Sequence, residues 1–131
     1  MYFRFKEYKK QKMIKKNRLK AALDGLATVF RGERNFKVHV FIFFLILLLG
    51  FFFQIKTWEW ILVLFTSAMV FSAEMFNTAI ENICDYIEPK MDSKIGKIKD
   101  ISASAVLTCA VISAVIGLLI FTPYFVRLLC D

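Results

Sequence analysis

The chain has 131 residues, enough for one domain, with 58% hydrophobic residues and a formal net charge of +7. A water-soluble domain of this size could not bury so much apolar surface, so the composition excludes an ordinary soluble fold. The three cysteines, Cys84, Cys109 and Cys130, are odd in number and lack metal-binding spacing. Neither a disulfide framework nor a zinc site is expected.

The N-terminal third is basic and partly amphipathic. Residues 1–12 form a basic tail with scattered aromatic residues. Residues 13–32 follow a helical pattern, in which four apolar side chains recur at steps of four, three and four: Leu19, Leu23, Leu26 and Phe30. A basic amphipathic helix of this kind lies in the membrane interface.

Three apolar segments follow, and we predict transmembrane helices at residues 36–53, 58–87 and 101–122. A hydrocarbon core of ~30 Å needs about 20 helical residues, and each segment comes close to or exceeds that length. Pro89 and Pro123 are expected to end the second and third helices. The sequence therefore predicts an all-α integral membrane protein, with a single domain over residues 1–131.

The distribution of lysine and arginine predicts the orientation. Residues 1–37 hold twelve of the eighteen, and residues 86–100 hold four more. Basic segments stay in the cytoplasm, so the N-terminus and the loop after the second helix are expected inside, and the C-terminus outside. The net charge then reflects topology and affinity for anionic lipid head groups, and gives no reason to expect nucleic-acid binding.

The second helix carries a polar stripe, which we define as Glu74, Asn77, Glu81 and Asp85. At about 100° per residue these side chains fall within roughly 80° of one another, and Glu74 and Glu81 are about 10.5 Å apart along the axis. Glu74 is expected deepest in the membrane and Asp85 at or beyond its surface. Carboxylates inside a membrane are costly, and they usually mark a functional site.

The stripe fits phosphoryl transfer between a soluble donor and a lipid. A deep carboxylate can take a proton from a lipid hydroxyl. A shallower carboxylate can hold Mg²⁺, which prefers oxygen ligands and substrate phosphates. Glu33 lies at about the membrane level of Glu81 and could complete a metal site, while Lys99 and Asp100 reach the same level from the third helix.

Three motifs in this order, "RGERNFKVH", "SAEMFNTAIENICDYI" and "KIGKIKDISASAVL", resemble the small prokaryotic diacylglycerol kinase family. The sequence is most similar to the Gram-positive branch of that family, the undecaprenol kinases, which share the ERNF-x-x-H and E-x-x-NTAIE patterns. The resemblance covers roughly residues 17–122. It implies a bacterial cell-membrane enzyme that forms a homotrimer, with each active site built between subunits.

The resemblance also implies roles for individual residues. Glu74 would be the general base and would meet the lipid substrate, with Ala103 nearby. Glu33 and Glu81 would bind the metal, Mg²⁺. The residues expected at the ATP nucleotide are Glu33, Asn77, Glu81, Lys90, Asp92, Lys99 and Asp100. Asp85 would support the stripe, and His39 is assigned no chemistry.

The predicted reaction is transfer of the γ-phosphoryl group of ATP to undecaprenol, with diacylglycerol as the alternative acceptor. Other classes remain open from the residues alone. A transporter or channel subunit would use Glu74 as a proton relay, and a passive membrane anchor would use the stripe only to hold helices together. Glu33 also fits a solvated partner of Arg31 or Arg34, and Lys99 with Asp100 also fits an interfacial anchor and helix cap.

Overall fold

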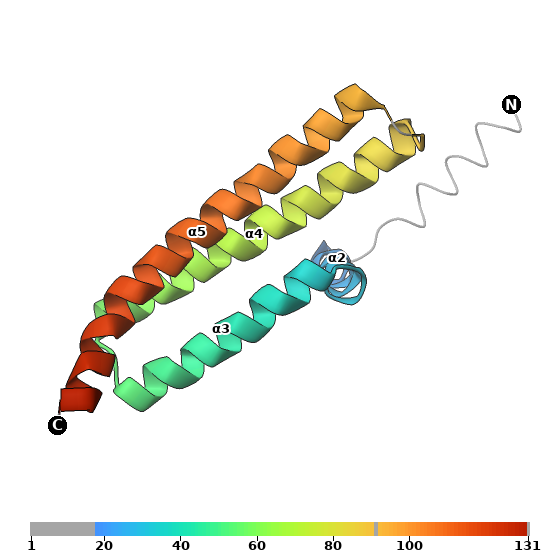
Figure 1. The fold of residues 1–131 in the computed structure, drawn as a ribbon. Coiled ribbons are helices and arrows are strands. Elements are labelled where there is room, and N and C mark those ends of the chain that lie inside the picture. Colours follow the sequence, from blue (N-terminus) through green and yellow to red (C-terminus); the bar gives the residue numbers. More distant parts are fainter. Residues whose placement is uncertain (1–17, 91, 131) are drawn as a thin grey trace, which may run out of the picture. The chain divides into compact units, whose positions relative to one another are not determined.

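The computed structural model describes residues 18–90 and 92–130, in which four α-helices are joined by short connections (Figure 1). The helices are α2 (Arg18–Gly32), α3 (Arg34–Phe53), α4 (Thr57–Ile87) and α5 (Ser93–Cys130). The last three are long and apolar enough to cross a membrane. This confirms the predicted all-α membrane architecture. The predicted basic tail and the first five residues of the predicted surface helix lie outside the described residues.

The chain divides into two units, of which the first, residues 1–32, contains α2. None of the residues of α2 is buried within the structure. Its apolar face is well exposed, and Leu19 and Leu23 show 68% and 57% of their surface. The helix ends at Gly32, and Glu33 adopts an extended backbone before α3 begins.

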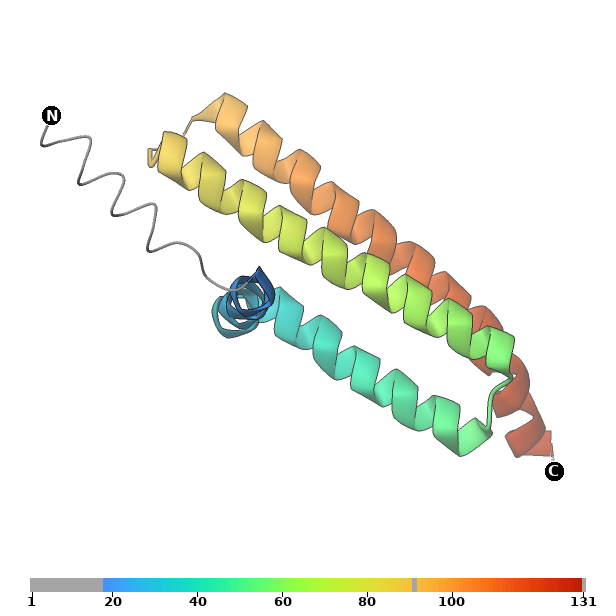
Figure 2. The same cartoon turned by 180° about the vertical axis from the view of Figure 1, so that it is seen from behind.

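The second unit, residues 33–131, contains the three long helices. The most extensive contact is between α4 and α5, and α3 makes a smaller contact with α4. Figures 1 and 2 show α4 and α5 running side by side and antiparallel along their length. Most of the large apolar side chains of these helices remain exposed. Such a surface is suited to lipid or to further subunits, because in water it would be a large unburied apolar patch.

A tight turn joins α3 to α4 and depends on one left-handed residue. Gln54 has φ 50° and ψ 50°, and the next amide, of Ile55, donates a hydrogen bond back to the carbonyl of Gly50 at 3.1 Å. This is the bonding of a Schellman helix end, in which the chain reverses while the last carbonyls stay paired. Ile55 is then buried in a small core with Val63, Ile120 and Phe121.

A polar contact reinforces the same end of the bundle. Glu59, in the first turn of α4, is only 6% exposed. Its Oε2 accepts hydrogen bonds from the Lys56 amide at 2.7 Å and from the Tyr124 hydroxyl at 2.6 Å. The carboxylate therefore caps α4 and links it to α5. The two hydrogen bonds also provide the donors that a buried charge requires.

Gly50 is tightly packed, and we expect Gly50→Ala to destabilise the protein. A Cβ at this position would lie 2.6 and 2.8 Å from two ring carbons of Trp60. Neither the ring nor α3 can move freely, because Trp60 also packs against Phe51. Overpacking of this kind costs about 1–3 kcal/mol. Thermal unfolding in detergent should show a lower midpoint, with Gly25→Ala, where nothing lies within 4 Å, as the control.

The third long helix extends beyond the predicted segment, residues 101–122, at both ends. At the start, Asp92 Oδ1 accepts hydrogen bonds from the amides of Lys94 and Ile95, so the helix begins at Ser93 instead of near Ile101. At the other end, the prediction that Pro123 ends the helix is wrong. Pro123 lies inside α5, which continues to Cys130.

The helix accommodates Pro123 although the residue lacks an amide N–H. The Thr122 hydroxyl donates to the Leu118 carbonyl at 2.6 Å, one position before the carbonyl that Pro123 leaves unpaired. Membrane helices tolerate a missing backbone hydrogen bond where neighbouring helices pack against them, and the adjacent Tyr124 is hydrogen-bonded to Glu59 of α4. Proline was therefore a poor signal for the end of this membrane helix.

Candidate active site

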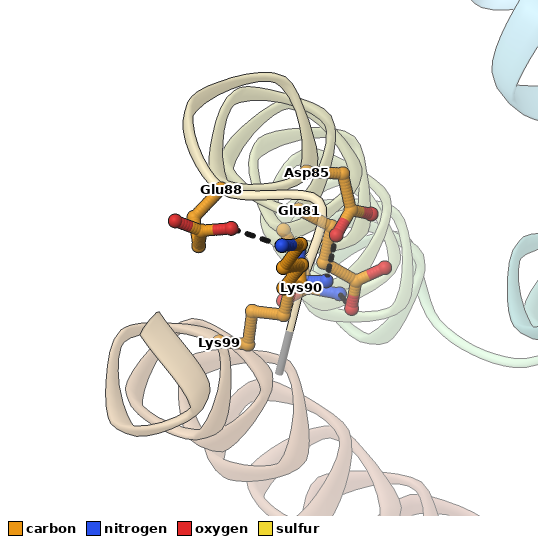
Figure 3. A network of polar contacts seen from close by, with 6 residues as sticks. Glu81, Asp85, Glu88, Lys90 and Lys99 are labelled. Carbon is orange, nitrogen blue, oxygen red and sulfur yellow. Dashed lines mark hydrogen bonds and ion pairs between the residues drawn. The ribbon is translucent and has the colours of Figure 1, made fainter. Parts of the chain in front are cut away.

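The polar stripe on α4 shows a gradient of burial. Glu74 is 3% exposed and Asn77 8%, whereas Glu81 is half-buried and Asp85 is exposed. The carboxylates of Glu81 and Asp85 project on the same side of the helix (Figure 3). Burial thus decreases along the stripe from the middle of α4 toward its C-terminal end, which we call the open end of the stripe. This is the order expected from the sequence.

The deepest carboxylate faces a histidine from another helix. His39 Nε2, on α3, lies 3.5 Å from Glu74 Oε1. The two side chains are 22% and 4% exposed. The carboxylates of Glu33 and Glu81 also act electrostatically on Glu74. The sequence pattern predicts no chemistry for His39, although a lone ionisable residue in an apolar span is itself a signal of a functional position.

Glu74 opens onto a cavity of about 280 Å³. All three long helices contribute to its wall: Asn35, Val38, His39, Glu74, Asn77, Ala103, Val106, Leu107 and Ala110. Ala103 was placed near Glu74 only by its position in the third motif. The structure brings both residues to one cavity.

A second, larger cavity of about 610 Å³ continues from the first. The two share His39 and Ala110, one from each side of the space between α3 and α5. The larger cavity is almost entirely apolar, with aliphatic side chains of α3 on one wall and small residues of α5 on the other. Ala110, Ala114 and Gly117 are the small residues that leave this space open. A carboxylate thus lies at one end of a hydrocarbon-lined space.

Next along the stripe, Asn77 orients Glu81. Asn77 Nδ2 donates to Glu81 Oε1 at 2.9 Å, which fixes one carboxylate oxygen. The other end of the amide is unusual. Asn77 Oδ1 is buried and has no hydrogen-bond partner among the described residues. Buried polar atoms are rarely left unpaired, so this oxygen is available to a ligand or a water molecule.

At the open end of the stripe, Asp85 of α4 pairs with Lys99 of α5 (Figure 3). Asp85 is 63% exposed and Lys99 33%, measured on the side chains. The contact joins the ends of the two helices that the loop connects. It also brings Lys99 to the stripe, as the sequence predicted, and gives Asp85 a partner that the sequence did not identify.

Three other residues were predicted at the nucleotide: Lys90 and Asp92 lie between α4 and α5, and Asp100 lies near the start of α5. The Lys90 amide donates to Glu88 Oε1 at 3.0 Å, which organises the loop (Figure 3). Asp92 uses one oxygen to cap α5. Asp100 is exposed.

Glu33 lies just before α3, half-buried, and its side chain makes no capping bond to that helix. Among the described residues, no group of three histidine, cysteine, aspartate or glutamate side chains is clustered closely enough to hold a metal ion by itself. A Mg²⁺ that arrives with nucleotide phosphates needs only one or two protein carboxylates. The oxygens of Glu33, Glu81 and Asn77 are of the kind that such an ion prefers.

Comparison with known proteins identifies the family. Residues 20–121 match the family described as prokaryotic diacylglycerol kinase. The chain belongs to that family. It is 39% identical over 99 residues to the undecaprenol kinase of Bacillus subtilis, across 76% of this chain and 80% of that protein.

Two other relatives are more distant. The diacylglycerol kinase of Haemophilus influenzae is 29% identical over 106 residues, across 80% of this chain and 90% of that protein. The diacylglycerol kinase of a Synechocystis species is 26% identical over 106 residues, across 80% of this chain and 61% of that protein. These relationships confirm the predicted family and its undecaprenol kinase branch. They make the chain a membrane lipid kinase with ATP as phosphoryl donor.

Proposed function

We propose that this lipid kinase phosphorylates the hydroxyl of undecaprenol to give undecaprenyl phosphate. The observation that carries the proposal is a buried carboxylate, Glu74, in the wall of a small cavity that shares His39 and Ala110 with a larger, mainly apolar cavity. A polyprenyl alcohol has the matching shape and polarity, with one terminal hydroxyl on a long hydrocarbon chain. The 39% identity to an undecaprenol kinase supports the same acceptor.

Glu74 would act as the general base. Its carboxylate takes the proton from the lipid hydroxyl, the oxygen attacks the γ-phosphorus of ATP, and the bond to the β-phosphate oxygen breaks to release ADP. Proton removal by a positioned group contributes about 10²–10⁴-fold to a rate. The remainder of the catalysis comes from alignment and charge neutralisation, as in other phosphoryl transfers.

The open end of the stripe would hold the nucleotide. Lys99 already lies against Asp85, and an ammonium group there can neutralise phosphate oxygens. Glu33 and Glu81 would hold Mg²⁺, with Asn77 fixing the direction of Glu81. The bound ion supplies positive charge to the phosphates. The nucleotide site is proposed to include Glu33, Asn77, Glu81, Lys90, Asp92, Lys99 and Asp100.

The proposed arrangement in the membrane follows from charge and exposed surface. The N-terminus and the α4–α5 loop are cytoplasmic and the C-terminus is outside, because lysine and arginine concentrate in the first two. The exposed apolar face of α2 suits the membrane interface. A homotrimer with shared active sites would cover part of the apolar surface that the three long helices leave exposed.

Diacylglycerol is the second candidate acceptor, since two relatives are diacylglycerol kinases. Its ester carbonyls lie close to the hydroxyl and would enter the larger cavity, whose lining is mainly apolar. The apolar lining therefore favours the polyprenyl alcohol. The same lining gives no support to a transporter or channel, which needs a polar path across the membrane.

The experiment that tests the proposed acceptor is phosphate transfer from γ-labelled ATP in mixed micelles with Mg²⁺. Undecaprenol and diacylglycerol are offered in parallel at equal mole fraction. We expect at least a tenfold higher kcat/KM for undecaprenol, a preference worth about 1.4 kcal/mol. A preference for diacylglycerol would overturn the proposed acceptor, and no transfer to either lipid by folded protein would contradict the kinase assignment itself.

A further inference from the structure

His39 is the ionisable side chain of α3 that reaches the site. It lies within an otherwise apolar stretch of the helix, residues 38–53, and contacts Glu74 across the gap between α3 and α4 at 3.5 Å. It lines both the smaller cavity, which also contains Glu74, and the larger apolar one. Within the described part of the chain, no other residue combines contact with the Glu74 carboxylate and a place in both cavities.

The surroundings of Glu74 give this contact its importance. The carboxylate is 3% exposed, and a buried carboxylate is stable only with donors or an opposite charge. Among the described residues, His39 is the basic side chain within ion-pair distance of it. In the smaller cavity, which Glu74 lines, the residues contributed by α5 are uncharged: Ala103, Val106, Leu107 and Ala110. The other charges that act on Glu74, those of Glu33 and Glu81, are repulsive.

We propose that His39 is a positioning residue for Glu74, an inference that rests on the proposed function. An Nε2–H directed at Oε1 holds the carboxylate toward the cavity and leaves Oε2 to accept the proton of the lipid hydroxyl. The contact of 3.5 Å is longer than a standard hydrogen bond. It shortens when substrate enters, since hydrogen bonds in active sites often tighten only in the complex.

This role makes a specific prediction for three substitutions. His39→Gln keeps an N–H donor at nearly the same reach and should retain most of the activity. His39→Leu has similar volume but no donor, and His39→Asn has a donor that is too short to reach. We expect both of these to lower kcat by about 10–100-fold, the usual loss when a partner that orients a reactive ligand is removed. KM for ATP should change less than about threefold, because the contact is remote from the proposed nucleotide end.

The measurement is the same transfer assay, with kcat and KM determined for each variant, and with thermal unfolding to verify folding. Phe41→Leu is the matched control, because Phe41 lies on the same helix and is 64% exposed, away from the site. Equal activity in all three His39 variants would overturn the proposal. So would equal losses in His39→Gln and His39→Leu, which would indicate packing and not a donor.

A double variant separates this inference from the proposed function. If His39 acts through Glu74, adding His39→Leu to Glu74→Gln should lower the residual rate by less than about threefold, since residues that act as a unit are not additive. If His39→Leu lowered the rate of Glu74→Gln by the same factor as it lowers the rate of the parent protein, His39 would act independently of Glu74. That result would overturn the proposal. If Glu74→Gln itself retained full activity, the proposed base would fail first, whatever His39 does.

Discussion

Glu74→Gln should lower phosphoryl transfer by about 10²–10⁴-fold, the range attributed to a general base. The substitution preserves the shape of the side chain but removes its ability to take a proton. Because Glu74 lies in the middle of the unit, apart from the Asp85–Lys99 end, KM for ATP should stay within about threefold. The rate is measured with γ-labelled ATP and undecaprenol in mixed micelles.

The chain offers a matched control in Glu59→Gln. Glu59 lies on the same helix and is 6% exposed, against 3% for Glu74, but it binds Lys56 and Tyr124 at the opposite end of α4. This variant should unfold at a lower temperature and keep its activity per folded molecule. If the two variants instead lost stability alike while both remained active, the polar stripe would be a structural seam and not a catalytic one.

Glu81→Gln should raise the Mg²⁺ concentration for half-maximal rate by more than tenfold. A carboxylate is a stronger ligand for Mg²⁺ than a carboxamide, because it carries charge and two oxygens. Asn77→Ala should give a rise of about 10–100-fold, since it removes the hydrogen bond that directs Glu81 and such supporting contacts have effects of that size. The rate is measured against Mg²⁺ at constant ATP, and KM for undecaprenol should not change.

Asn82→Ala is the control for the metal prediction. Asn82 is the exposed neighbour of Glu81 and lies outside the stripe. It should leave the Mg²⁺ dependence as it is in the parent chain. A normal Mg²⁺ dependence in Glu81→Gln, with a reduced maximal rate, would remove Glu81 from the metal site and leave it only a role in shaping the stripe.

Helix periodicity explains why so much of the site could be predicted. Four polar residues at spacings of three and four must share a face of any regular helix, so Glu74, Asn77, Glu81 and Asp85 were grouped before the fold was known. Their graded burial followed from position along the span. The resemblance in the motifs then predicted the family, which the comparisons confirm.

Helix ends were predicted less well, because they depend on local bonds that composition does not reveal. Asp92 could be a loop residue or a cap, and only its hydrogen bonds to Lys94 and Ile95 show that α5 begins at Ser93. Proline ends many helices. Here the helix continues past Pro123, because membrane helices tolerate the unpaired carbonyl where packing against neighbouring helices supports them.

Composition and helical period were enough to predict the three long apolar helices, the amphipathic segment before them and the position of each polar residue along α4. These features follow from composition and from the period of a single helix. The tertiary structure decided which residues meet across helices: His39 with Glu74, Asp85 with Lys99, and Glu59 with Tyr124. It also decided where the two cavities open. Such contacts depend on how helices are rotated and inclined against one another, and that arrangement is set by packing of many side chains together.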